Sequence, residues 1–155
     1  MRLAVKLLLL WFVVFGLAIG LWQAVFPASF YADFPGMGHH WVSPDGPYNE
    51  HLLRDVGLGN LAIGAVALVA LRTGVVWLAR AVGLAVVVVN LPHQLYHQAH
   101  VSVLPTMTDQ VLQSVSLAAV SLAAISLVVL AFRLPAAPAS TAPPTTHRAP
   151  APTHL

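Results

Sequence analysis

Three histidines, His93, His97 and His100, are spaced four and three residues apart in the second half of the chain. Because an α-helix turns by about 100° per residue, this spacing places the three imidazoles within one narrow arc of a helix. Imidazole nitrogens bind zinc, copper and iron, and they titrate close to neutral pH. The pattern therefore indicates a metal site or a pH-sensitive cluster, provided that a second element supplies further groups.

A second helix is predicted to supply those groups in its first turns. It begins at Asn49, and Thr73-Gly74 makes a tight turn between it and the histidine-bearing helix. Helices joined by so short a turn are antiparallel neighbours, so the acidic start of one and the histidine end of the other lie at similar depth. The candidate ligands for a divalent transition metal (zinc, copper or iron) are His93, His97, His100, His51, Asp55 and Glu50.

Other uses of these residues stay open. Haem needs one axial histidine on each of two facing helices, which His51 with His93 or His97 would supply. One alternative is a metal- or haem-dependent membrane oxidoreductase, and another is a module whose titrating imidazoles sense pH or bind a partner. In the simplest interpretation the histidines and acids hydrogen-bond one another, and His39-His40 is a solvated pair. We expect a structural or metal-binding role without catalysis.

The composition indicates which kind of scaffold positions these groups. Hydrophobic residues make up 58% of the 155 residues and charged residues only 8%. A soluble domain carries about 25% charged residues, so this chain is predicted to be an integral membrane protein with the lipid bilayer as its main partner. The seven basic residues are too scattered for nucleic-acid binding, and the absence of cysteine excludes thiol chemistry.

Four apolar stretches predict an all-α bundle of four transmembrane helices, since about 20 apolar residues cross the hydrocarbon core. The predicted spans cover residues 5–26, 50–72, 75–101 and 108–132, which form a membrane domain of residues 1–132. The first span exceeds the 7–15 apolar residues of a secretory signal, so we expect it to be retained. Residues 133–155 are rich in Pro and Ala and are predicted to be a disordered cytoplasmic tail.

Small and polar residues predict how these helices contact one another. Gly16-x-x-x-Gly20 either lets a neighbouring helix approach closely or reflects the frequency of Gly in membrane helices. Asn60 and Asn90 are each expected to form an interhelical hydrogen bond. Thr106-x-x-Asp109 resembles a capping box with Asp in place of Glu, which marks the start of the last helix.

The distribution of charge predicts the orientation. Cytoplasmic loops carry an excess of Lys and Arg, and six of the seven basic residues fall on the face that carries both termini. We therefore predict a protein of the inner (plasma) membrane with both termini in the cytoplasm. All five acids lie on the opposite face. The six basic residues are Arg2, Lys6, Arg72, Arg80, Arg133 and Arg148, and the seventh, Arg54, lies with the acids.

Three segments resemble a group of small bacterial four-helix membrane proteins that are DoxX-like in general shape. This resemblance covers residues 1–132; it implies a four-helix fold and a membrane location, and it assigns no activity and no catalytic residue. A homo-oligomer or a membrane-protein partner stays open. The segments are Phe30-Tyr-x-x-Phe-Pro with Trp41, then Gly46-Pro-Tyr-Asn-Glu-His-Leu-Leu-Arg-Asp-Val-Gly57, and Pro92-His-x-x-Tyr-His97.

Overall fold

The computed structural model describes residues 1–135, so most of the predicted tail (136–155) lies outside the described residues. Four helices of the described part are long and apolar enough to cross a membrane, which confirms a multi-pass membrane protein. They are α1 (Leu3–Val25), α3 (Glu50–Thr73), α4 (Val76–Ala99) and α5 (Met107–Phe132). The shorter elements are α2 (Pro27–Asp33), β1 (Pro35–Gly36), β2 (His39–His40) and the 3-10 turns η1 (Ser43–Asp45) and η2 (Val101–Val103).

Local signals place the helix ends within two residues of the predicted bounds. The Asn49 side chain caps α3 by accepting a 3.0 Å hydrogen bond from the Leu52 N–H. Gly74 ends α3 in the left-handed conformation, with φ of 70°, and its N–H donates to the Ala70 carbonyl. The short turn between α3 and α4 is therefore present as predicted.

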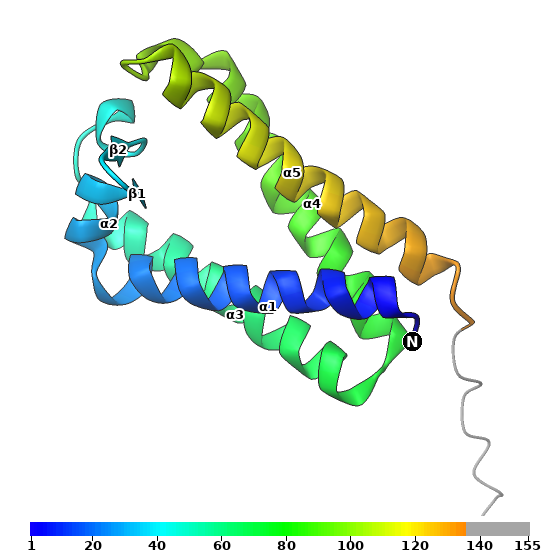
Figure 1. Ribbon diagram of the computed structural model, residues 1–155. Helices are drawn as coiled ribbons and strands as arrows, with labels where there is room; N and C mark the ends of the chain where they lie inside the picture. The colour runs from blue at the N-terminus through cyan, green and yellow to red at the C-terminus, as the bar shows by residue number, and fades with distance from the viewer. Residues whose placement is uncertain (136–155) are drawn as a thin grey trace, which may run out of the picture.

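The four long helices form two pairs that meet at one end and diverge toward the other (Figure 1). The first pair is α1 with α3, and the second pair is α4 with α5. We call the end with the N-terminus and the Gly74 turn the turn end. The opposite end, which carries residues 26–49 and 100–106, is the loop end. The predicted four-helix bundle is thus present in part, as two helix pairs arranged in a V, because α3 and α4 diverge beyond the turn that joins them.

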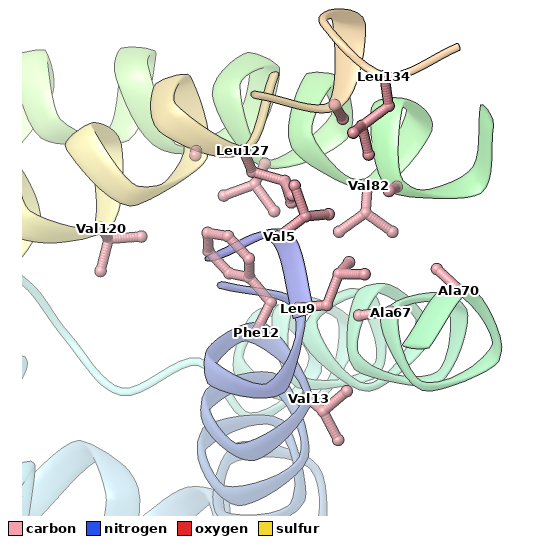
Figure 2. Close-up of a cluster of buried hydrophobic side chains, with 14 residues drawn as sticks. Val5, Leu9, Phe12, Val13, Ala67, Ala70, Val82, Val120, Leu127 and Leu134 are labelled. Atoms are coloured by element: carbon pink, nitrogen blue, oxygen red, sulfur yellow. The ribbon is translucent and has the colours of Figure 1, made fainter. Parts of the chain in front are cut away.

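The hydrophobic core fills the apex of this V near the turn end (Figure 2). Val5 and Leu9 of α1 are completely buried and point toward Val82 of α4 and Leu127 of α5. Burial of these side chains joins the two pairs through non-directional apolar contacts. The core residues are Val5, Leu9, Phe12, Val13, Ala67, Ala70, Ala79, Val82, Val86, Val120, Ala124, Leu127, Ala131 and Leu134.

Glycines bring α1 and α3 into backbone contact within the first pair. A Cβ added at Gly57 would lie 2.6 Å from the Ala24 nitrogen, and one added at Gly20 would lie 2.7 Å from the Leu61 nitrogen. Gly16 likewise faces Gly64 across the same seam. The Gly16-x-x-x-Gly20 pattern therefore serves close helix packing, the first of the two interpretations above.

Polar side chains also link the helices within each pair, and two of these links come from the asparagines Asn60 and Asn90. The Asn60 amide of α3 donates to the Gln23 carbonyl oxygen of α1 at 2.7 Å. The Asn90 amide of α4 donates to the Ser121 hydroxyl of α5, also at 2.7 Å. Both predicted interhelical hydrogen bonds are confirmed, and each strengthens one pair without joining it to the other.

Candidate functional site

A chain of aromatic side chains holds the loop of residues 26–49 on the first pair. Trp22 of α1 meets Phe30 edge-on, with ring centroids 5.4 Å apart, and Phe30 stacks on Phe34 at 4.6 Å. Phe34 then meets Trp41 at 5.9 Å. Because such contacts add to the burial of large rings, the loop is a packed element with a fixed direction. It carries His39 and Trp41 toward the start of α5.

The carboxylate of Asp109, in the first turn of α5, receives three hydrogen bonds there. The Trp41 indole N–H donates to Oδ1 at 2.9 Å, and the His39 Nδ1 lies 2.6 Å from the same oxygen. The Thr106 hydroxyl donates to Oδ2 at 2.5 Å, and its oxygen accepts the Asp109 N–H at 3.0 Å. The predicted cap at Thr106-x-x-Asp109 is therefore confirmed. We call Asp109, His39, Trp41 and Thr106 the Asp109 latch.

This latch joins the two helix pairs at the loop end. His39 and Trp41 belong to the loop packed on α1, whereas Asp109 and Thr106 belong to the start of α5. Asp109 is only 5% exposed, and the amino end of a helix favours a negative charge. A buried carboxylate that accepts three hydrogen bonds is satisfied without any ligand.

His39, one of the two neighbouring histidines that were expected to be solvated, therefore takes part in the Asp109 latch. The prediction for His39 was wrong, since its ring is partly buried against Asp109. His40 is exposed, and its Nδ1 lies 2.5 Å from the Ala32 carbonyl oxygen. The spacing of these residues carried no signal for this contact, because 70 residues separate His39 from Asp109.

The candidate ligands on α3 pair with one another along their own helix. The Arg54 guanidinium donates to Glu50 at 2.8 Å, and the His51 Nε2 lies 3.3 Å from the Asp55 carboxylate. Both are i, i+4 pairs on the exposed side of α3, where such pairs contribute a few tenths of a kcal/mol. Arg54 also donates to the Ala24 carbonyl, which links the start of α3 to the end of α1.

The candidate ligands His93 and His97 of α4 do share one stripe, as their spacing predicted, whereas His100 lies just past the end of the helix. His93 and His97 meet edge-on with ring centroids 4.5 Å apart, and His100 stacks on Tyr96 at 4.2 Å. This stripe lies at the loop end of the second pair, whereas Glu50, His51 and Asp55 lie at the loop end of the first.

The structure does not gather the two sets of candidate ligands. Among residues 1–135, no group of three or more His, Asp or Glu side chains lies close enough to hold a metal ion. The turn at Gly74 fixes only one end of α3 against α4, and α4 packs mainly on α5. The candidate ligands of α3 and α4 lie at the same end of the molecule, but the two sets do not form one site.

Comparison of the chain with protein-family models, curated proteins and solved structures finds no match. The DoxX-like resemblance therefore stays a prediction. Function must follow from the side chains themselves, and the Asp109 latch is the best-connected polar group at the loop end.

Proposed function

We propose that this protein is a non-catalytic protein of the inner (plasma) membrane whose loop-end histidines and carboxylates have a structural role. In this proposal the Asp109 latch holds the open ends of the two helix pairs together. The surrounding apolar faces contact lipid, a second copy of the chain or another membrane protein. The observation that carries the proposal is the set of three hydrogen bonds on Asp109, two of which come from the other pair.

The proposed orientation places both termini in the cytoplasm. Arg2 precedes α1, Arg72 lies in the last turn of α3 and Arg80 near the start of α4, so these charges are at the turn end. Arg54 is at the loop end. An excess of basic residues is typical of the cytoplasmic side of a membrane protein. This supports placing the loop end on the opposite, extracytoplasmic side of the membrane.

A structural role is also supported by how the other loop-end groups are used. Asp33 accepts a 3.1 Å hydrogen bond from Ser29, Glu50 pairs with Arg54, and the His100 Nδ1 lies 2.8 Å from the Tyr96 carbonyl oxygen. Asp33, Glu50 and His100 are exposed, and each already has a protein partner, so none of them needs a ligand to satisfy its polar atoms.

A distance measurement between the two pairs tests the latch. The chain has no cysteine, so Leu52→Cys on α3 and Leu95→Cys on α4 give two unique and exposed spin-label sites. In lipid nanodiscs, the distance distribution between these labels reports the separation of the loop ends. Asp109→Leu should broaden the distribution and move it to longer distances, because His39 and Trp41 lose their shared acceptor.

The matched control is Asp55→Leu, which removes another loop-end carboxylate. Asp55 is exposed, and within residues 1–135 its ion pair is with His51 of its own helix, so the distribution should not change. An Asp109→Leu variant that keeps the wild-type distribution while remaining folded by circular dichroism would refute the structural role.

A metal site is the second candidate, and the contact between His93 and His97 favours it. Two imidazoles on one helix face can supply two nitrogen ligands for zinc, copper or iron. Metal analysis of the detergent-purified protein should then give one ion per chain, lost in a His93→Ala, His97→Ala, His100→Ala triple variant. Far less than one ion per chain in the wild type would end this hypothesis, and a haem absorption band would favour the oxidoreductase alternative.

A further inference from the structure

A small cavity of about 50 Å³ lies between the two helix pairs, close to the middle of all four long helices. Phe15 of α1 and Val89 of α4 both line it, next to the hydrophobic core. Its described lining is uncharged and mostly apolar. The lining residues are Phe12, Phe15, Gly16, Asn60, Ile63, Val86, Val89, Asn90 and Val120.

Two carboxamides line this cavity, one from each pair. The Asn90 amide nitrogen donates to Ser121 and to the Leu117 carbonyl, which can only accept. These two bonds fix the orientation of the Asn90 carboxamide. Its Oδ1 is then left as a hydrogen-bond acceptor. Ser121 gives its own proton to Gln94, at 2.5 Å, and so accepts from Asn90.

Asn60 lines the cavity from the other pair, and its partner is a carboxamide rather than a backbone carbonyl. The Asn60 amide nitrogen donates to Gln23, which leaves its Oδ1 as the remaining polar atom of the group. Both walls therefore offer hydrogen-bond acceptors, and a molecule that fits must donate. It must also be neutral, because no charged side chain of the described residues lines the cavity to balance an ionised group.

The size of the cavity limits the donor to a small group. A volume of about 50 Å³ is several times the roughly 10–15 Å³ needed by one water molecule, but it is well below the engineered cavity of about 150 Å³ that holds benzene. A hydroxyl with its carbon fits, and a ring does not. The remainder of a larger molecule would extend between the pairs along Phe15, Ile63 and Val89, which suits hydrocarbon chains.

We propose that this cavity binds the free hydroxyl head group of a neutral lipid, a diacylglycerol, which donates its single proton to the Oδ1 of Asn90. An uncharged head group reaches the middle of the bilayer far more cheaply than a phosphate does, and an acceptor there offsets the cost of burying its hydroxyl. The proposal is independent of the Asp109 latch, since none of the latch residues lines the cavity.

Native mass spectrometry of the detergent-purified protein tests the site with 1,2-dioctanoylglycerol as the probe. We expect saturable binding of one molecule per chain. The same glyceride with its free hydroxyl acetylated should bind at least tenfold more weakly, because blocking the donor removes roughly 1.4 kcal/mol or more of hydrogen-bond free energy. Asn90→Ala should weaken binding of the free glyceride by a similar factor.

Two further variants separate loss of the site from loss of the fold. Val120→Phe should abolish binding by filling the cavity, and it leaves every hydrogen bond of Asn60 and Asn90 in place. Gly59→Ala, beside Asn60 but open to the surroundings, should bind as the wild type does. Equal binding of the free and acetylated glycerides would overturn the proposal. So would the absence of any bound glyceride, in which case the cavity holds only water.

Discussion

Substitution of Gly57 by Ala should separate α1 from α3 and destabilise the protein. The new Cβ would lie 2.6 Å from the Ala24 nitrogen, 2.7 Å from the Gln23 Cβ and 2.9 Å from the Gly20 oxygen. A carbon atom packs at about 3.5–4.0 Å from its neighbours, so the helices must part by close to 1 Å. Two of the three obstructing atoms are backbone, and a change of side-chain rotamer cannot relieve them.

The magnitude follows from two opposing effects. Ala in place of Gly in a helix gains roughly 1 kcal/mol of helix propensity, whereas overpacking of a fitted interface costs about 1–3 kcal/mol. Because the clash at Gly57 is with backbone, we expect the upper part of that cost and a net loss of roughly 1–2 kcal/mol. Gly59, two residues away, has nothing within 4 Å of an added Cβ. Gly59→Ala should therefore gain up to about 1 kcal/mol.

Titration with SDS in mixed micelles, followed by tryptophan fluorescence, gives the free energy of unfolding of each variant. The two alanine variants should move in opposite directions and differ by about 2–3 kcal/mol, which is roughly a hundredfold in the unfolding equilibrium. Equal free energies for Gly57→Ala and Gly59→Ala would refute the backbone contact between α1 and α3.

Three further changes test other contacts. In a double-mutant cycle, Gln23→Leu and Asn60→Leu should show a coupling of about 0.6–2 kcal/mol in the same SDS titration, and additive losses would contradict their hydrogen bond. Arg80→Met should lower the free energy of unfolding by about 1 kcal/mol, because the guanidinium donates to two carbonyls at the end of α5; an unchanged value would argue against this role. Trp41→Phe keeps the ring packing and removes the indole donor to Asp109, so it should broaden the spin-label distances less than Asp109→Leu; equal broadening would show that packing controls the latch.

Local chemistry made most of the fold predictable. The length of the apolar stretches gave four spans, Gly74 marked the turn, and Thr106-x-x-Asp109 marked the start of α5. The contact between His93 and His97 also followed directly from helical periodicity. Each of these features depends on residues that are neighbours in sequence.

The V shape and the latch could not be predicted in the same way. Antiparallel order says which helix ends share a side of the membrane, but all four surfaces are apolar and do not specify which helices pair. The glycine seam that decides the first pair joins residues such as Gly20 and Gly57, far apart in sequence. Likewise, His39 and Asp109 are 70 residues apart, and only the folded aromatic loop brings them together.

The placement of the polar links has a mechanical consequence. Gln23 with Asn60 stiffens one pair and Asn90 with Ser121 stiffens the other, whereas smooth hydrocarbon side chains join them at the apex. Such a joint has no preferred hydrogen-bonding geometry to break, so each pair can tilt as a lever. A change in bilayer thickness would then mainly change the angle between the two helix pairs. The hydrogen bonds of the Asp109 latch would limit how far this angle can change. Spin-label distances in short-chain and long-chain lipids should reveal this motion, and identical distances in both would show a rigid joint.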